Sequence, residues 1–416
     1  MASYAISVHA HFYQPPRGNP LTGKIGTERT AAPYRNWNER NTEVIYRPNA
    51  ALGNFENLSF DMNDSLLDWL SHRGQETFQR IVQAVRTHRQ TTKTSNVLAS
   101  PLHHSPMPLL SRRDRLTQLR WGQASAKARF GVEPRGVFLP GFAADLATLQ
   151  SVVDAGYGFT MLRASQVDGL PRRWGAGPYQ ISLPSGSKLA VFVVNDDLSK
   201  SMCDDIDERC GAGHWARREL GTHFRHAGAL TLLYIDGETL GKHRMGEAHF
   251  MHYLLNHEAP SVSYKPVTLE AYYNSNPTPV GEIELLPYQR HETDVQRQLR
   301  DAFHDLMTEA NLLFAEVVGD QAWALRDQSW HKSAEHRELV QSQIVLQQAW
   351  ANTEIDDFDL GVTYPVHCAA LAVELIRAAT HTDLSGILTD RLPAEYLMTF
   401  QEAQDAFRQE FTAATV

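Results

Sequence analysis

The chain has 416 residues, of which 42% are hydrophobic and 21% are charged, a composition typical of a globular protein with one large domain and a smaller one. The net charge of −9 and the lack of a basic stripe argue against a nucleic-acid partner. No uncharged apolar run is long enough to span a bilayer, and the strand-like start "MASYAISVHAHF" lacks the features of a signal peptide, so we predict no membrane partner.

Short apolar runs alternate with longer amphipathic runs over the first two thirds of the chain. Strands are predicted at residues 4–10, 95–101, 136–140, 158–162, 189–194 and 230–236. Helices are predicted at residues 65–90, 112–131 and 145–156. Because the strands are mostly apolar and alternate with helices, they are expected to form a parallel sheet, either a barrel or an open sheet.

Two segments of this part are long and poor in regular patterns. Residues 13–57 are rich in Pro, Asn, Arg and aromatic residues, and we expect them to form an ordered loop that lines a site. Residues 163–187 are expected to form a loop or a small hairpin.

The strand pattern ends near residue 285, and only helices are predicted beyond it. Helical periodicity covers residues 294–319, 336–353, 365–380 and 393–411. We therefore predict two domains, a βα domain over residues 1–285 and a helical domain over residues 286–416.

The cysteines are few and odd in number, which indicates a reducing compartment, so we predict a cytoplasmic protein. Cys203, Cys210 and His214 can be interpreted as metal ligands, but their spacing is not a standard zinc pattern. The sequence therefore predicts no metal and no other cofactor.

Two histidines follow the first predicted strand in "VHAHFYQPP". His9 and His11 are two residues apart, so they point to the same side of an extended chain. At the carboxyl end of a barrel strand they would point into the mouth of the barrel. We interpret them as ligands of a substrate or a metal; the alternative is a pair of structural histidines.

Two acids flank a glycine at the end of another apolar strand, in "LLYIDGETLGKH". An acid in this position that is partly shielded by apolar neighbours can have a raised pKa and act as a general acid, which is the role we predict for Asp236. The alternative is that Asp236 caps a helix and Glu238 is an acid of its first turn.

A second histidine pair, His103 and His104, follows the strand predicted at residues 95–101. His104 would join His9 and His11 around one pocket. Three histidines can hold a zinc ion beside an acid, which keeps a metal-dependent hydrolase open as a hypothesis.

The stretch "GVFLPGFAAD", residues 136–145, is a predicted buried strand that ends in a Pro-Gly turn. Strand ends of this kind often carry catalytic groups in α/β proteins. This turn offers no carboxylate, hydroxyl or imidazole group, so it is either an active-site strand without its chemistry or not an active-site strand at all.

The stretches "VHAHFYQPPR", "YRNWNER", "YRPNAA", "GVFLPGFAADLATL" and "YIDGETLGKH" occur in the order and approximate spacing of glycoside hydrolase family 57. The chain resembles most the bacterial branch of that family that has a C-terminal helical domain. The resemblance implies an irregular (β/α)7 barrel followed by an all-α domain. It also implies retaining hydrolysis or transfer at α-glucosidic bonds without a metal.

The resemblance assigns roles to individual residues. Asp236 matches the general acid/base of the family, and Glu238 matches the supporting acid after it. The Glu that serves as nucleophile is replaced by Gly141. A retaining glycosidase needs two carboxyl groups about 5–5.5 Å apart, and Gly141 supplies none. The predicted substrate-binding residues are His9, His11, Trp37, Glu39, His104, Trp121, Phe142 and His243.

Three functions stay open from the sequence. The first is an enzyme that hydrolyses or transfers α-glucans with altered chemistry, because Asp236 is retained. The second is a non-catalytic relative that binds an α-glucan, an oligosaccharide or a partner protein, because Gly141 replaces the nucleophile. The third is a metal-dependent hydrolase or deacetylase that uses His9, His11 and His104.

Overall fold

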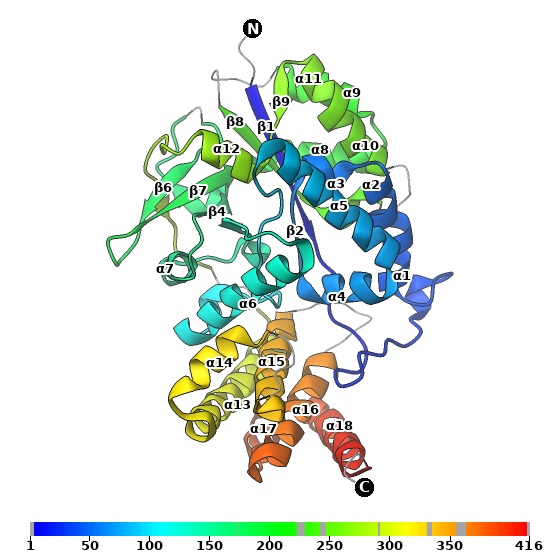
Figure 1. Ribbon diagram of the computed structural model, residues 1–416, viewed down its shortest axis with the longest axis vertical. Helices are drawn as coiled ribbons and strands as arrows, with labels where there is room; N and C mark the ends of the chain where they lie inside the picture. Colours follow the sequence, from blue (N-terminus) through cyan, green and yellow to red (C-terminus); the bar gives the residue numbers. More distant parts are fainter. Residues whose placement is uncertain are drawn as a thin grey trace. The chain divides into compact units, whose positions relative to one another are not determined.

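The structure, a computed structural model, describes residues 4–172, 174–222, 229–241, 247–289, 292–330, 335–354 and 363–413 (Figure 1). The chain divides into two units. The first unit consists of Met1–Gln14, Trp37–Pro101 and Pro106–Tyr288, and the second of Pro15–Asn36, Leu102–Ser105 and Gln289–Val416. The second unit thus takes in two short segments that precede residue 285 in the sequence, and the predicted division into domains at residue 285 stays a prediction.

Strand β1 (Tyr4–Phe12) lies at the centre of the first unit. Every residue after Tyr4 in this strand is buried, which is the pattern of a strand covered on both faces. It pairs in parallel with β2 (Ser59–Met62) and with β8 (Leu230–Asp236). Bridges from β2 to residue 97 and from residue 99 to β3 (Gly136–Val137) continue the ladder. The predicted strand at 95–101 is thus a short link in the sheet.

The ladder continues from β3 through β4 (Phe159–Arg163) to β7 (Lys188–Val194), with parallel pairing throughout. The backbone N–H of Asn195, just after β7, donates to the carbonyl of Leu232 in β8 at 2.9 Å, which closes the circuit. This arrangement is an irregular (β/α)7-type barrel, as the sequence predicts. Shorter strands are β5 (Val167–Asp168), β6 (Tyr179–Ser182), β9 (Tyr264–Pro266) and β10 (Glu284–Leu285).

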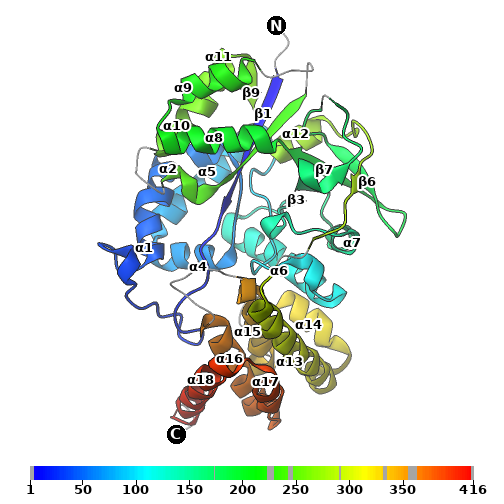
Figure 2. The same cartoon turned by 180° about the vertical axis from the view of Figure 1, so that it is seen from behind.

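Helices lie on both sides of β1 in the two views of Figures 1 and 2. Side-chain caps begin several of them: Ser111, Asp145 and Asn195 accept hydrogen bonds from backbone N–H groups of α6, α7 and α8. The α-helices of this unit are α1 (Trp37–Asn41), α2 (Arg47–Ala51), α3 (Asn54–Asn57), α4 (Asp64–Arg73), α5 (Gln75–Thr92), α6 (Arg112–Phe130), α7 (Leu146–Asp154), α8 (Asp196–Glu208), α9 (Ala212–Trp215), α10 (Glu247–Tyr253), α11 (Ala259–Ser261) and α12 (Leu269–Ser275).

Three expectations about local structure were wrong. The helix predicted over 65–90 is two helices, because Gly74 leaves the helical conformation between α4 and α5 (φ −111°, ψ 36°). Apart from proline, glycine is the residue least favourable to a helix interior. Much of the segment 13–57 is helical and not a loop. Strand β2 was not predicted, because Ser59–Met62 is short and contains an aspartate, which strands normally exclude.

The second unit is helical after residue 289, as predicted. Its α16 packs against both α15 and α18. Glu374 of α16 is fully buried and accepts hydrogen bonds from Gln404 and Arg408 of α18 at 2.9 and 3.0 Å. No helix among the residues described is long and apolar enough to cross a membrane. The helices are α13 (Asp294–Val318), α14 (Ala322–Gln328), α15 (Arg337–Ala351), α16 (Thr363–Thr380), α17 (Ser385–Arg391) and α18 (Ala394–Ala413).

Gly237, at the end of β8, packs directly against the ring of Phe12 in β1. A Cβ atom at this position would overlap that ring, so we expect Gly237→Ala to lower the free energy of unfolding by about 1–3 kcal/mol. Urea denaturation followed by tryptophan fluorescence measures the change. The control is Gly211→Ala, where an added Cβ meets no atom within 4 Å and φ is −76°. Equal stability of the two variants would contradict the close packing of β8 on β1.

Candidate active site

The parallel pairing of β1 with β2 and β8 brings three ionisable side chains side by side. His11 lies opposite Asp61 of β2 and opposite Asp236 of β8. The three residues stand at the carboxyl ends of their strands, the edge at which α/β proteins carry their sites. Asp61 was missed at the level of sequence because the strand that carries it was not predicted.

Asp61 is fully buried between the two histidines of β1. One carboxylate oxygen lies 3.1 Å from His9 Nε2, and the other lies 2.9 Å from His11 Nδ1. Burial alone would raise the pKa of Asp61, but the charge and hydrogen bond of His11, helped by His9, lower this pKa to about 2. Asp61 is therefore an anion at neutral pH despite its complete burial.

The two histidines respond differently to the same carboxylate. Burial lowers the pKa of His9, and its contacts with Asp61 do not compensate. Burial also opposes the charge of His11, but Asp61 attracts that charge, as do Glu238 and Asp236, so the pKa of His11 is raised. The surroundings therefore favour the charged form of His11 and disfavour that of His9.

The side chain of His9 is fully buried. The sequence left open whether His9 binds a substrate or is a structural histidine, and its role stays a prediction. The rings of Phe138 and Tyr234 lie 5.3 and 6.3 Å from it. His11 is 5% exposed and lies 4.7 Å from Phe138 between ring centroids. These aromatic rings exclude water from the histidine pair.

Asp236 is exposed at the end of β8, so the apolar shielding expected from the sequence is absent. The hydroxyl of Tyr234, two residues earlier on the same strand, donates to Asp236 Oδ1 at 2.6 Å. This charge-assisted hydrogen bond orients the carboxylate on the outer side of the cluster. Asp236 is thus open to a ligand at the strand ends.

Glu238 lies in the short 3-10 turn that follows β8 and is half-buried. Its Oε1 accepts a hydrogen bond from the Tyr46 hydroxyl at 2.7 Å and from the Tyr13 backbone N–H at 3.1 Å. Burial raises its pKa to about 7, although Tyr46 and His11 favour the charged form. Glu238 therefore exchanges its proton near neutral pH.

Gly141 stands in the 3-10 turn after β3 and is exposed. Its φ of +59° is in the left-handed region, which costs an L-residue with a side chain about 1–2 kcal/mol. A Cβ atom at this position would meet no atom within 4 Å. The position offers no chemical group, yet it leaves space for one.

Phe142 also has a left-handed backbone, with φ of +56°, and its side chain is 1% exposed. Its ring lies 5.2 Å from Phe138 and 4.8 Å from Tyr234, and the guanidinium carbon of Arg163 lies 4.5 Å above it. Phe142 fills the interior beside the strand ends under the guanidinium group of Arg163, and its role in substrate binding stays a prediction.

The other predicted substrate-binding residues are less closely tied to this cluster. Trp121 is fully buried in α6 and offers no face to a sugar. Trp37 and Glu39 are half-buried in α1, and their role stays a prediction. His104 belongs to the second unit, so its meeting with His9 and His11 stays a prediction as well. His243 lies outside the described residues.

Metal-ligating side chains gather at a different place from the one predicted. Over the residues described, one group of three ligand atoms within 4.8 Å of one another is formed by Asp205, Cys210 and His214. Cys203, which the sequence grouped with Cys210 and His214, is not a member. Neither is the pair His9 and His11.

Comparison with known proteins identifies a family. The sequence model described as glycosyl hydrolase family 57 matches residues 8–283. This range includes the second half of β1, all of β2 and β8, and the site residues discussed above. A search of the curated proteins found no match.

Solved structures share the fold of this chain at low sequence identity. A branching enzyme from Pyrococcus horikoshii has a TM-score of 0.66 at 14% identity, covering 98% of this chain and 96% of that chain. A maltose-forming amylase from Pyrococcus sp. ST04 has a TM-score of 0.65 at 12% identity, covering 99% and 85%. An α-amylase from Thermotoga maritima has a TM-score of 0.61 at 14% identity, covering 98% of both chains.

Asp61→Asn removes the negative charge that favours the charged form of His11. We expect the pKa of His11 to fall, and the free energy of unfolding to drop by about 3–5 kcal/mol, because a buried charge loses its partner. An NMR titration of the histidine ring protons measures the pKa, and denaturation measures the stability. Glu238→Gln is the control, since Glu238 acts on His11 only through its charge and less than Asp61 does. An unchanged pKa of His11 in Asp61→Asn would contradict the ion pair.

The raised pKa of Glu238 makes stability depend on pH. Because the folded state holds this proton more tightly, its contribution is fully present below pH 4.5 and is lost as the pH rises to about 7. We expect wild-type stability, relative to Glu238→Gln, to fall by up to about 3 kcal/mol over this window. Urea denaturation at several pH values measures the difference, and parallel pH profiles of the two proteins would refute the expectation.

Proposed function

The chain belongs to glycosyl hydrolase family 57, and from this premise we propose that it binds α-glucans at the strand ends around Asp236 without the retaining hydrolysis typical of the family. The observation that carries the proposal is Gly141, an exposed glycine with open space beside it where the family resemblance expects a nucleophilic Glu. The retaining reaction needs a second carboxyl group there, paired with Asp236.

Other carboxyl groups nearby are poor substitutes for the missing one. Asp61 is fully buried and paired with His11, so it is closed to a sugar. Glu238 Oε1 is engaged by Tyr46 and by a backbone N–H. Asp145 caps α7 through the backbone N–H of Thr148 at 2.7 Å. Each carboxylate already has a structural partner whose loss would destabilise the fold.

The ligand class follows from the proteins that share the fold. They include a branching enzyme, a 4-α-glucanotransferase from Thermococcus litoralis and α-amylases. An exposed, oriented carboxylate suits this class, because it accepts hydrogen bonds from sugar hydroxyl groups. An α-glucan or oligosaccharide bound at Asp236 is the partner we propose.

The open space beside Gly141 favours a second candidate function, catalysis with a nucleophile supplied from outside. Formate or azide would attack the anomeric carbon from that space, while Asp236 gives its proton to the leaving oxygen. The balanced products are a glycosyl formate or glycosyl azide and the shortened glucan. Turnover of maltooligosaccharides that needs formate or azide would favour this candidate over binding alone.

We also propose a cellular location and a division of the chain into domains. We infer a cytoplasmic location, because Cys203, Cys210 and Cys368 are free thiols. We also propose that residues 1–285 form the barrel domain and residues 286–416 the helical domain. Expression of residues 1–285 alone tests the division, since a self-sufficient domain unfolds cooperatively without the helices.

Gly141→Glu restores the carboxyl group that the proposal treats as missing. We expect wild type to bind maltooligosaccharides, measured by calorimetry, without cleaving them. We expect Gly141→Glu to cleave them at least tenfold faster than the wild-type background, measured by chromatography of the products. Gly141→Gln is the matched control, since it adds the same bulk and the same left-handed strain without the charge. Asp236→Asn in the Gly141→Glu background should abolish the gain.

The outcomes separate the hypotheses. Neither binding nor cleavage by wild type would refute an α-glucan function. Cleavage by wild type that Asp236→Asn abolishes would refute the binding-only proposal and show that another group replaces the nucleophile. Binding by wild type without any gain in Gly141→Glu would mean that Phe142 and Arg163 have reshaped the cleft too far for the family reaction.

A further inference from the structure

The connection between α8 and α9 brings together side chains that ligate metals. Arg209 ends α8 with a left-handed backbone (φ 70°), and the Cys210 N–H then donates to the carbonyl of Asp205 at 2.8 Å. This turn folds Cys210 back over the last turn of α8. His214 follows in α9, and the ligand atoms of the three side chains all lie within 4.8 Å of one another.

Asp205 supplies an independent indication that a ligand is missing. Its side chain is 95% buried, and Oδ1 accepts a hydrogen bond from Arg218 at 2.7 Å. Its Oδ2 is buried and has no hydrogen-bond donor, and His214 Nδ1 lies 3.7 Å from it. A buried carboxylate oxygen without a hydrogen-bond donor destabilises the fold, so this oxygen is available to bind a ligand that is not a hydrogen-bond donor.

We propose that Asp205, Cys210 and His214 bind one divalent transition-metal ion, with zinc as the best match. Carboxylate, thiolate and imidazole are the ligands that zinc takes in proteins, and three of them leave a fourth position for water. The Zn–ligand lengths of about 2.0–2.3 Å place tetrahedral ligands about 3.3–3.8 Å apart. The distances between the three ligand atoms, at most 4.8 Å, therefore need to shorten by about 1–1.5 Å at most.

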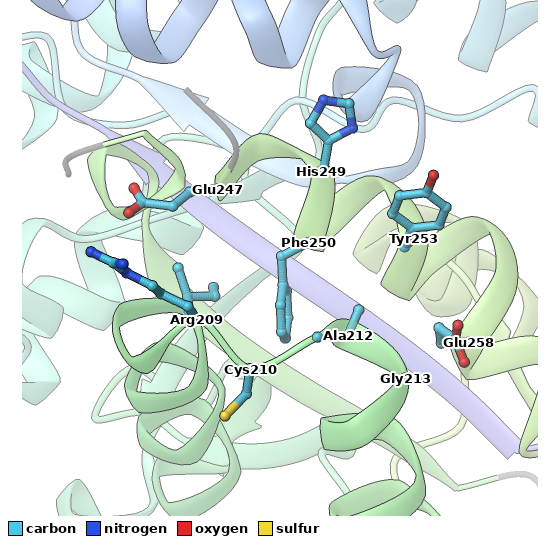
Figure 3. A pocket seen from close by; sticks show the side chains of 11 residues that line it. Arg209, Cys210, Ala212, Gly213, Glu247, His249, Phe250, Tyr253 and Glu258 are labelled. Carbon is cyan, nitrogen blue, oxygen red and sulfur yellow. The ribbon is translucent and has the colours of Figure 1, made fainter. Parts of the chain in front are cut away.

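The surroundings allow this closure. His214 has a side chain that is 60% exposed, so its ring is free to turn toward the other two ligands. Arg218 holds the opposite oxygen of Asp205, the arrangement in which a second shell orients a ligating carboxylate. Figure 3 shows Cys210 between Arg209 and Ala212, with its sulfur pointing away from Phe250; both Cys210 and Phe250 line a cavity of about 420 Å³.

The spacing explains why the sequence did not indicate this site. Cys210 and His214 are visible as a pair, but the third ligand is Asp205 and not Cys203. A carboxylate five residues before a cysteine has no standard motif. The left-handed turn at Arg209 brings Cys210 next to Asp205. The proposal revises the expectation that the protein holds no metal.

The test uses the full-length protein after dialysis against a chelator. Calorimetric titration with zinc chloride should give one ion per chain, and cobalt(II) should give the absorption band of a thiolate-to-cobalt charge transfer. Cys210→Ser and His214→Ala should each weaken zinc binding at least tenfold, and Cys210→Ser should abolish the charge-transfer band. Zinc should raise the melting temperature of wild type and leave that of Cys210→Ser unchanged.

Cys203→Ser and His249→Ala are the matched controls, because Cys203 lies in α8, the helix of Asp205, and His249 lines the same cavity as Cys210, while neither is a proposed ligand. Both should bind zinc like wild type. Circular dichroism of the metal-free variants verifies that they fold. The proposal is overturned by the absence of stoichiometric zinc binding, by binding without a thiolate band, or by equal losses in Cys203→Ser and Cys210→Ser.

Discussion

The buried carboxylate of Asp61 is the interaction on which the strand ends depend. It lies between the two histidines of β1, whose charges and hydrogen bonds lower its pKa to about 2 despite its burial. His11 in turn lies opposite Asp236, and although burial opposes its charged form, the carboxyl groups of Asp61, Glu238 and Asp236 raise its pKa. One imidazole thus interacts with three carboxyl groups. The register of β1 against its two neighbours therefore sets the electrostatics of the site together with its geometry.

The glycine at residue 141 is accompanied by an unusual environment. The next residue, Phe142, shares the left-handed backbone and buries its ring against Tyr234, whose hydroxyl orients Asp236. Arg163 lies over Phe142 and forms an ion pair with Asp196 at 2.7 Å. The guanidinium group of Arg163 over the ring of Phe142 thus lies next to Gly141 in the chain.

Helix α8 links this environment to the proposed metal site. Asp196, in its first turn, pairs with Arg163, while Asp205, in its last turn, is a proposed metal ligand. The two residues are about 14 Å apart along the helix axis, at 1.5 Å per residue. A metal bound at Asp205 would lie at the other end of α8 from this ion pair. Its effect would be to fix the end of α8 and the start of α9.

The sequence by itself determined β1, β8 and the helical character of the chain after residue 289, because apolar periodicity is a property of neighbouring residues. It also placed Asp236 at a strand end. Only the tertiary structure decided that Ser59–Met62 is a strand, since its aspartate is tolerated there through histidines about 50 residues away. The exposure of Asp236, the burial of Phe142 and the meeting of Asp205 with Cys210 were likewise decided by partners distant in the chain or by a single left-handed turn. Burial and charge compensation depend on such partners, and local sequence patterns do not contain them.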